Sequence, residues 1–524
     1  MSGMFDQKQD KAKRKLVRTK QEEKANKKTR KTAIIVITVM LVLSISAMLL
    51  NSGFLRRIVP VVTIDGVSFS VAEFEYFFNS EYMDYINFLQ QFQGMMGPGP
   101  DSGRPLSAQI HDPETGQTWA DFVTQMTLER MTNLVSLYNA AIDAGFELSE
   151  EQLAEIEADI DMLEVQAMIN QFPTTLSFLQ QVFGTGMNER VFRDIQKFIA
   201  LASLHSEHVR ESFEFSPEEL ASYYDENRDE LDVFNYRQFT VNMEYIDEEE
   251  FIDSDEYEAA REVAATDARF LAASIAERIN SEDSFNAEAM GYSVDYMDVA
   301  STLRTVQGSR LDADAIDWFV DDSRTYGDVT IVDSENGSNI ILFISRDDNN
   351  YRTAGMRQIL ISSAFVDPEE FELGEDDPEY MLAVEHAENE AHERAELVRS
   401  LFIAEGEDEA ALTSLLEEHS DDRTEGGYYP YIAKFSYRSS YINVVKLVPE
   451  IEQWLFDENR VTGDWELIFT EAFGYHLVYF TGFGELFFEL MVDDILRTES
   501  HTEWVESLPL GEPVRYFSFI LVHT

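Results

Sequence analysis

The second half of the chain contains an internal repeat, and no other feature of the sequence constrains the fold as strongly. The stretch 316–328 (IDWFVDDSRTYGD) and the stretch 452–464 (EQWLFDENRVTGD) share a Trp, an Arg, a Gly and a final Asp at one constant offset. A matching strand, YRQF at 236–239 and MRQI at 356–359, opens each copy. A repeat of about 120 residues indicates two tandem domains of one fold rather than a solenoid. The identical pairs are Trp318 and Trp454, Arg324 and Arg460, Gly327 and Gly463, and Asp328 and Asp464.

Each copy predicts an α+β unit: an opening strand, a long helix, a middle segment, a short helix and closing strands. The residues before the repeat are typical of a helical domain, because capped helical patterns follow a short strand pair turned at Asp65–Gly66. The periodicity predicts helices over 174–183 and 188–213. The expected caps are Ser70 with Glu73, Ser149 with Gln152, and Ser216 with Glu219 behind Pro217.

Charge is distributed unevenly along the chain. It has 99 acidic and 40 basic residues, a formal net charge of -59, whereas residues 1–31 hold 12 basic and 4 acidic residues. The uncharged run that follows (33–50, AIIVITVMLVLSISAMLL) predicts a transmembrane helix over 32–55. The positive residues before it predict a single-pass membrane protein with a cytoplasmic N-terminus and an extracytoplasmic body. A cleaved signal peptide is the alternative.

Several classes of function are not expected. A body this acidic repels phosphate backbones, so we expect no nucleic-acid partner. We find no glycine-rich phosphate loop, no nucleophile signature and no zinc or calcium ligand pattern, so we expect no nucleotide, cofactor or metal. The chain has no cysteine, which excludes disulfides and thiolate chemistry.

The second copy resembles a parvulin-type peptidyl-prolyl isomerase domain. The matching segments are RQILI (357–361), LLEEHSDD (415–422), the glycine pair 426–427, KLVPEIEQWLF (446–456) and FGYHLVYF (473–480). The helical domain, with IDGVSFSVAEF and FSPEELASYYDENRDELD, is similar to the chaperone domain of the PrsA and SurA group of exported foldases. Together the resemblance covers roughly residues 61 to 510 of this sequence.

The resemblance implies a proline site in the second copy. Rotation about an X–Pro bond has a barrier of about 18 to 20 kcal/mol, which an enzyme lowers by holding the ring and favouring the twisted amide. The implied polar cluster is Gln358, Asp422 and His476, and the implied apolar cup is Leu447, Ile451, Phe456 and Phe473. Gln358 stands where parvulins usually have a histidine, and Tyr428-Tyr429-Pro430 replaces the usual aspartate-leucine-glycine. In the first copy Gln238 on the opening strand again replaces the histidine, and the offset of the repeat places Ala315 and Ile340 at the positions of Ile451 and His476, so we expect that copy to be degenerate.

The expected organisation has six parts, and the expected function follows from them. They are a basic cytoplasmic tail (1–31), a transmembrane anchor (32–55), a helical chaperone domain (61–232), a degenerate parvulin-like domain (233–350), a parvulin-like domain (354–482), and a C-terminal helix and tail (483–524) that packs back on the helical domain. We expect a membrane-anchored folding factor that holds unfolded or secreted polypeptides, with prolyl isomerase activity that is weak or lost. The alternatives are an active isomerase acting through 354–482 and a non-catalytic surface scaffold.

Overall fold

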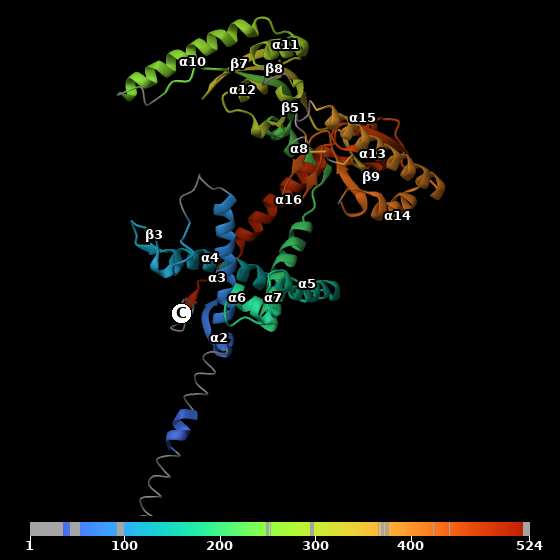
Figure 1. Ribbon diagram of the computed structural model, residues 1–524. Coiled ribbons are helices and arrows are strands. Elements are labelled where there is room, and N and C mark those ends of the chain that lie inside the picture. The colour runs from blue at the N-terminus through green and yellow to red at the C-terminus, as the bar shows by residue number, and fades with distance from the viewer. Residues whose placement is uncertain are drawn as a thin grey trace, which may run out of the picture. The chain divides into compact units, whose positions relative to one another are not determined.

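The computed structural model describes residues 35–41, 53–91, 99–247, 251, 253–293, 298–364, 366–367, 371, 377–422, 424–439 and 441–516. It divides into two compact units (Figure 1). The first contains the residues up to Phe213 and those from Ser500 onward, and the second contains Glu214–Glu499. The finer division into six parts remains a prediction.

The expectation of a single-pass membrane protein is corrected by this structure. Among the described residues, no helix is long and apolar enough to cross a membrane. The described helix within the expected span covers residues 35–41, which at about 1.5 Å per residue is about a third of a hydrocarbon core of roughly 30 Å. The rest of 32–52 lies outside the described residues. The transmembrane part of the expected fold, the single-pass location and the membrane as a partner are therefore withdrawn.

The first unit combines a small sheet with a group of helices. Strand β1 (Pro60–Ile64) pairs antiparallel with β2 (Val67–Ser70) and, on its other side, with β15 (Val514–Arg515) from the C-terminal end. A strand from near the C-terminal end of the chain is therefore part of the first unit. Its helices are α2 (Phe54–Ile58), α3 (Val71–Gln91), α4 (Trp119–Asp143), α5 (Glu150–Ile169), α6 (Thr175–Phe183) and α7 (Glu189–Glu211), with η1 (Leu106–Ala108) and the hairpin of β3 (Ile110–Asp112) and β4 (Gln117–Thr118) between α3 and α4.

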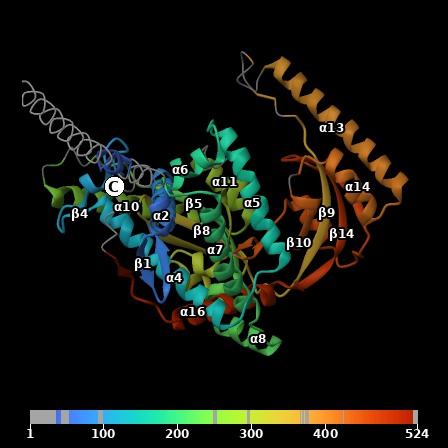
Figure 2. The same ribbon diagram turned by 90° about the horizontal axis from the view of Figure 1, so that it is seen from below.

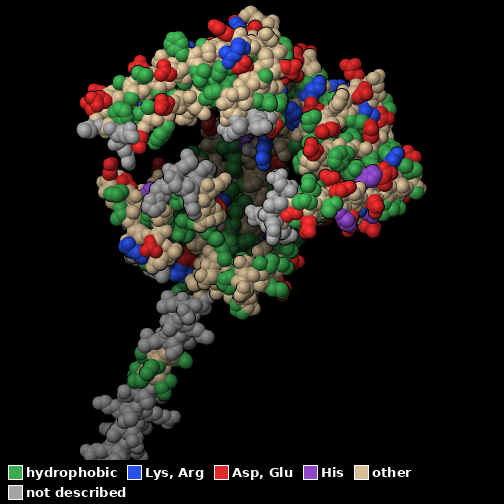
Figure 3. Space-filling model, turned by 45° about the horizontal axis from the view of Figure 1, so that its top comes forward, with side chains coloured by type: hydrophobic (Ala, Val, Ile, Leu, Met, Phe, Trp, Pro, Cys, Tyr) green, Lys and Arg blue, Asp and Glu red, His purple; other side chains and the backbone are tan. Residues whose placement is uncertain are grey.

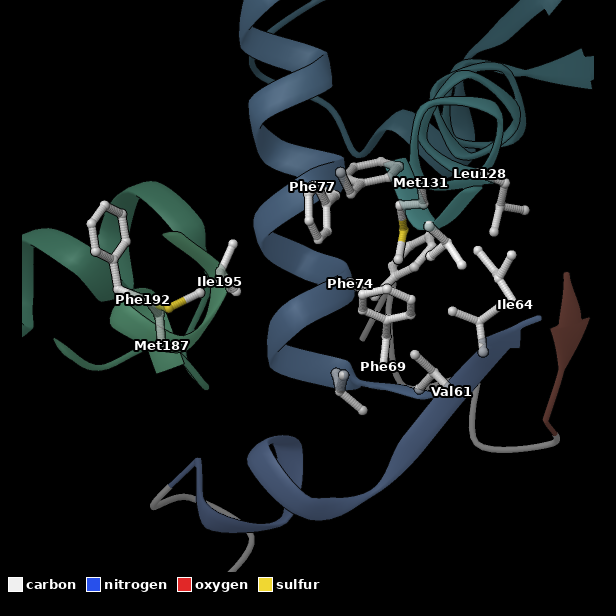
Figure 4. Close-up of a cluster of buried hydrophobic side chains, with 14 of the residues drawn as sticks. Val61, Ile64, Phe69, Phe74, Phe77, Leu128, Met131, Met187, Phe192 and Ile195 are labelled. Atoms are coloured by element: carbon white, nitrogen blue, oxygen red, sulfur yellow. The ribbon is translucent and has the colours of Figure 1, made fainter. Parts of the chain in front are cut away.

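Helix α3 passes through the core of the first unit. Figure 4 shows buried side chains of β1 and α4 on one side of α3 and those of α7 and the residues before it on the other. The side chains labelled there are Val61, Ile64, Phe69, Phe74, Phe77, Leu128, Met131, Met187, Phe192 and Ile195. Apolar residues at helical spacing therefore make one core from segments up to about 130 positions apart in the chain.

The expected helix caps are confirmed. Ser149 and Gln152 bond each other's backbone N–H, and so do Ser216 and Glu219, with Pro217 opening α8 (Pro217–Glu226). The Ser70 backbone N–H donates to Glu73 at 2.6 Å, and the Glu73 N–H donates back to Ser70 at 3.4 Å. Helices α6 and α7 lie within one or two residues of their predicted bounds.

A buried ion pair joins α2 to α3. Arg56 bonds Glu75, which is only 7 % exposed. Gly184 and Gly186 allow the chain to pass close by, because a Cβ on Gly184 would stand 2.7 Å from Oε2 of Glu75 and one on Gly186 would stand 2.9 Å from Cβ of Arg56. Burial raises the pKa of Glu75 to about 7, although Arg56 works in the opposite direction.

We predict that Glu75 makes the first unit less stable as the pH rises. The folded chain keeps a proton on Glu75 that the unfolded chain releases, so this stabilisation is complete below the unfolded pKa of 4.5 and is lost as the pH rises through about 7. Between about pH 5 and about pH 8 the opening free energy of α3, measured by hydrogen exchange of the whole chain, falls by about 2 to 3 kcal/mol more than in Glu75→Gln. Glu129→Gln, at an exposed position of α4, keeps the wild-type pH dependence. Equal pH dependence of wild type and Glu75→Gln would contradict this assignment.

The second unit contains two four-stranded antiparallel sheets with the same topology. The first has the order β6 (Leu303–Gln307), β5 (Val233–Asn242), β8 (Gly337–Asp347), β7 (Val329–Ser334), and the second has the order β10 (Tyr428–Ile432), β9 (Arg352–Ile361), β14 (Gly474–Leu486), β13 (Trp465–Thr470). The helices after the opening strands are α10 (Ser254–Ala276), α11 (Glu282–Tyr292) and α12 (Ile316–Phe319) in the first copy, and α13 (Pro378–Glu405), α14 (Glu409–His419) and α15 (Pro449–Leu455) in the second. The remaining elements of this unit are α9 (Arg228–Leu231), η4 (Val299–Thr302), η5 (Gly308–Arg310), β11 (Tyr437–Arg438) and β12 (Asn443–Val444), while α16 (Phe487–Ser507) runs from this unit into the residues of the first.

Each sheet of the repeat is covered on one face by its two longer helices. Figure 2 shows α13 and α14 beside β9 and β14, and a buried cluster joins them through Ile359, Ile361, Leu477, Ala391, Ala395, Val398, Phe402, Leu412 and Leu415. In the first copy α10 and α11 cover β5 and β8 through an equivalent cluster around Phe239, Phe285 and Leu342. Because side chains alternate along a strand, Gln358 and His476 point to the other face.

The four identical residues of the repeat have the same role in both copies. The guanidinium of Arg324 lies 5.1 Å from the ring of Trp318, and that of Arg460 lies 3.9 Å from the ring of Trp454. Gly327 and Gly463 have φ values of 93° and 100°, which favour glycine, and their N–H groups bond Phe343 and Phe480 on the last strand. The backbone carbonyl oxygens of Asp328 and Asp464 accept hydrogen bonds from the N–H groups of Phe343 and Phe480, respectively. The repeat is therefore a structural device that ties the short helix to the closing strand.

Candidate functional site

The three predicted polar residues of the second copy lie side by side. Gln358 is on β9 and His476 is on β14, where antiparallel pairing sets Gln358 opposite Val478 and His476 opposite Leu360. The Nδ1 of His476 is 2.9 Å from Oε1 of Gln358, and the Nε2 of Gln358 is 2.8 Å from Oδ2 of Asp422 in the loop after α14. Gln358 and His476 are buried. The strand pairing and the end of α14 therefore bring three separate segments to one row of hydrogen bonds.

The chemistry of these groups fixes the direction of each bond. A carboxylate only accepts, so the amide nitrogen of Gln358 faces Asp422 and its carbonyl oxygen faces His476. That carbonyl oxygen also only accepts, so Nδ1 of His476 carries the proton and donates it. The Nε2 of His476 then accepts from the hydroxyl of Thr470, which is 3.0 Å away on β13. The row holds a neutral His476 in its Nδ1–H tautomer.

Two residues that the sequence analysis did not assign to the site extend this row. The hydroxyl of Tyr429 donates to Oδ2 of Asp422 at 2.8 Å and lies 2.8 Å from the hydroxyl of Thr424. Thr470 bonds His476 and is 2 % exposed. Tyr429, the second residue after the glycine pair, was noted as part of a departure from the family, but the sequence carries no signal for the reach of its hydroxyl. Thr470 is opposite Gly474 at the start of the hairpin that carries His476.

The environment sets the protonation of the row. Burial lowers the pKa of His476 to about 4, although Asp422 and Glu450 favour its charged form. Burial alone would raise the pKa of Asp422, but hydrogen bonds from the Thr424 backbone, from Tyr429 and from Gln358 outweigh it and lower that pKa. Burial raises the pKa of Tyr429. At neutral pH the row therefore consists of an ionised Asp422, a protonated Tyr429 and an uncharged His476.

The predicted cup residues lie in two kinds of surroundings. Leu447, Ile451 and Phe456 pack in one apolar cluster with Val478 and with Tyr429, and Ile451 is 1 % exposed. Within this cluster Phe456 also packs edge-on to Tyr351, which directly precedes β9 and is seven positions before Gln358, so Phe456 lies toward the end of the cluster away from the polar row. Phe473 is 52 % exposed, with its ring 6.4 Å from that of His476. The apolar wall nearest the polar row therefore consists of Leu447, Ile451 and Tyr429.

The first copy has a different arrangement at the equivalent place. The hairpin after β7 is one residue shorter than the hairpin after β13, so Asn339 and not Ile340 corresponds to His476. The constant offset used above fails at this turn. Asn339 accepts a hydrogen bond from Thr240 at 2.7 Å, and the positions of Leu447 and Ile451 are taken by the buried Leu311 and Ala315. Among its described residues, which leave out 294–297 after α11, the first copy therefore keeps a small polar contact, and no row joins three segments.

In the part of the chain that the structure describes, no group of three or more His, Cys, Asp or Glu side chains is placed to hold an ion. What the row and its apolar wall can do chemically is to hold an apolar ring beside oriented hydrogen-bond donors and acceptors.

Comparison with solved structures gives weak similarities, among them the following two. A structure reported with PEB4 and Cj1289, two SurA-like chaperones of Campylobacter jejuni, is 13 % identical, covers 39 % of this chain and 80 % of its own, and has a TM-score of 0.17. The structure of PrsA from Bacillus subtilis is 13 % identical, covers 44 % of this chain and 73 % of its own, and has a TM-score of 0.15. No protein-family model and no curated protein matches the chain. Similarity at this level carries no argument about function, which rests here on the residues themselves.

We predict that Thr470→Val weakens the second copy. The substitution keeps the shape of the side chain but leaves the Nε2 acceptor of His476 buried without a donor, which costs about 1 to 3 kcal/mol. The measurement is the opening free energy of the β14 amides from hydrogen exchange of the whole chain. Thr462→Val, at an exposed position, serves as the control. An unchanged opening free energy in Thr470→Val would show that His476 does not depend on this hydroxyl.

Proposed function

We propose that this chain is a protein-folding factor that holds unfolded polypeptides, and that residues 354–482 form a parvulin-like module that binds proline with weak or lost isomerase activity. The sequence resemblance to the PrsA and SurA group supports this proposal. The observation that carries it is a helix of the first unit, α5, with apolar residues on two opposite faces.

Helix α5 buries one apolar face and exposes another. At about 100° per residue, the buried residues fall on one side of the helix and the exposed apolar residues on the other. The buried set is Ile156, Ile160, Leu163 and Ala167. The exposed set, called here the α5 stripe, is Met162, Val165, Met168 and Ile169, with exposed fractions of 52, 42, 71 and 66 %. The outer face of a surface helix is ordinarily polar, so the α5 stripe has another purpose.

The side chains of the α5 stripe are suited to contact with partners of many different apolar shapes. Methionine is flexible and polarizable, so its side chain adapts to many apolar shapes, and contiguous exposed apolar surface is typical of an interaction site. The net charge of -59 keeps a chain with such a surface soluble. Figure 3 shows acidic side chains spread over the visible face among the hydrophobic ones. Apolar contact surface combined with strong self-repulsion supports a holding function.

We predict that the α5 stripe is required to suppress aggregation. The whole chain, at an equimolar ratio to a chemically denatured client protein, lowers the light scattering that follows dilution of the client. Met168→Ser with Ile169→Ser removes the two most exposed apolar side chains of the stripe and reduces this suppression several-fold, because apolar contact area is the source of affinity.

A matched control lies in the second unit. Val263 and Phe270 on α10 are 62 and 75 % exposed, so Val263→Ser with Phe270→Ser removes a similar amount of exposed apolar surface elsewhere. This variant keeps wild-type suppression. Failure of the wild type to suppress aggregation at all would remove the holding function and favour a surface scaffold.

Prolyl isomerase activity is the second candidate, and the convergence of Gln358, Asp422 and His476 beside Ile451 favours it. Preorganised polar groups next to an apolar wall are what a twisted prolyl amide requires. Against it stands the internal satisfaction of the row, in which each polar side chain is already bonded to a neighbour within the row.

We predict the outcome of an isomerase assay on the whole chain. If the module is active, the chain speeds cis-to-trans conversion of an X–Pro peptide, and Asp422→Ala and His476→Gln each return the rate to the uncatalysed value. His386→Gln, an exposed histidine of the same module, leaves the rate unchanged. A wild-type chain without any acceleration would exclude the isomerase and leave the holding function standing.

A further inference from the structure

The last turns of α7 and α16 meet in the first unit around two histidine rings. His205 on α7 is 5 % exposed, and its Nδ1 is buried with no hydrogen-bond partner among the described residues. His501 lies on α16, and its Nε2 is 2.8 Å from the hydroxyl of Ser206 on α7. The ring of Trp504 on α16 lies 5.9 Å from that of His205 and 5.5 Å from that of His501. These contacts hold the end of α16 against α7.

This contact lies next to the two points where the chain passes from one unit to the other. The chain leaves the first unit after Phe213, just beyond α7, and returns to it at Ser500, within α16. In the second unit the hydroxyl of Tyr223 on α8 donates to Glu499 on α16 at 2.8 Å. In the first unit the bond between hydroxyl and imidazole described above has the same role. Each unit therefore has a bond of its own that holds its part of α16.

The surroundings of both rings oppose protonation. Burial lowers the pKa of His205, and the neighbouring His208 lowers it further. Burial also lowers the pKa of His501, and Arg210 acts in the same direction, although the Ser206 backbone favours the charged form. Both rings are therefore uncharged at neutral pH. A proton on either ring places a charge in a poorly hydrated position beside a group that is itself cationic or becomes cationic in acid.

Acidic side chains do not compensate for this charge. Within the described part of the chain neither ring forms an ion pair, and the only charged groups that act on their pKa values are cationic when charged. Arg497, one turn before His501, is paired with Asp493 at 2.5 Å. The carboxylates near the contact on α4, the loop that carries Phe146, α7 and α16 are exposed, so water and salt screen them. They are Asp143, Glu147, Glu207, Glu211, Glu503 and Glu506.

We propose that the contact between α7 and α16 is an acid-sensitive latch, in which protons on His205 and His501 release the last turns of α16 from the first unit. The inference goes beyond the proposed function, because it concerns neither clients nor proline. A histidine whose pKa in the folded chain is below the unfolded value of 6.5 stabilises the contact fully above about pH 6.5, and this stabilisation is lost as the pH falls. The start of α16 stays in place, because Phe487, Leu490 and Met491 are buried in the second unit.

The test is hydrogen exchange of the whole chain at pH 7 and pH 5, with each rate corrected for the intrinsic exchange rate at that pH. In the wild type the protection of the amides of 500–507 falls by about tenfold or more at pH 5, because both histidines take up protons when the latch opens. The protection of 487–494 does not change. His205→Phe with His501→Gln replaces both rings by groups that do not titrate, so its protection at 500–507 is the same at both pH values. His386→Gln, at an exposed histidine of the second unit, responds like the wild type.

His501→Gln alone is a second variant, should the double variant fold poorly. It keeps one titrating ring, so its loss of protection in acid is several-fold smaller than that of the wild type. Glu75 cannot cause the loss, because its raised pKa makes the first unit more stable in acid. Equal protection of 500–507 at the two pH values in the wild type, an equal loss at 487–494, or a loss that persists in the double variant would overturn the inference. None of these measurements involves a client, so the holding function is tested separately.

Discussion

The antiparallel pairing of the opening strand with the closing strand is the interaction on which each copy of the repeat depends. In the second copy β9 and β14 are adjacent in the sheet although about 120 residues separate them, and their register places Gln358 within two positions of His476. The helices between them follow from this pairing, because α13 and α14 cover the face that the alternate residues of β9 and β14 leave apolar. The polar row then lies on the opposite face of the sheet. On that face the described residues form no helix as long as α13 or α14. Site geometry is therefore a consequence of strand register.

Local features of this fold were predictable from the sequence, while features set by register were not. The caps at Ser149 and Ser216 depend on residues three positions apart, and both formed as expected. The correspondence of Ile340 with His476 failed because a single residue is added in a hairpin, and one residue in a strand moves every following side chain to the other face. The apolar run at 33–50 illustrates a different limit. Composition alone predicted a spanning helix there, whereas the described helix covers seven positions.

The polar residues of the site could be predicted from the sequence, but the contacts that each residue makes could not. Gln358, Asp422 and His476 were chosen by resemblance, and the structure brings them within hydrogen-bond distance. Phe456 was chosen by the same resemblance, and it packs in the same apolar cluster as Ile451 but with its ring against Tyr351, at the start of β9. Tyr429 lies in the segment where the sequence departs from the family. A tyrosine has an apolar ring and a polar hydroxyl, so one side chain can complete an apolar wall and also bond a carboxylate. The spacing of residues in the sequence does not indicate which of these contacts the side chain makes.

The two copies show how a buried polar row is kept or lost. A row of this kind is stable only if every donor and acceptor is matched, because one unsatisfied buried group costs more than a satisfied pair contributes. The second copy meets this condition with five side chains drawn from four strands and one loop. The first copy meets this condition with fewer polar groups. Thr240 donates a hydrogen bond to Asn339 across adjacent strands, and Leu311 and Ala315 are buried where the second copy has its apolar wall. A partial row would be less stable than either arrangement, because an unmatched donor or acceptor would stay buried.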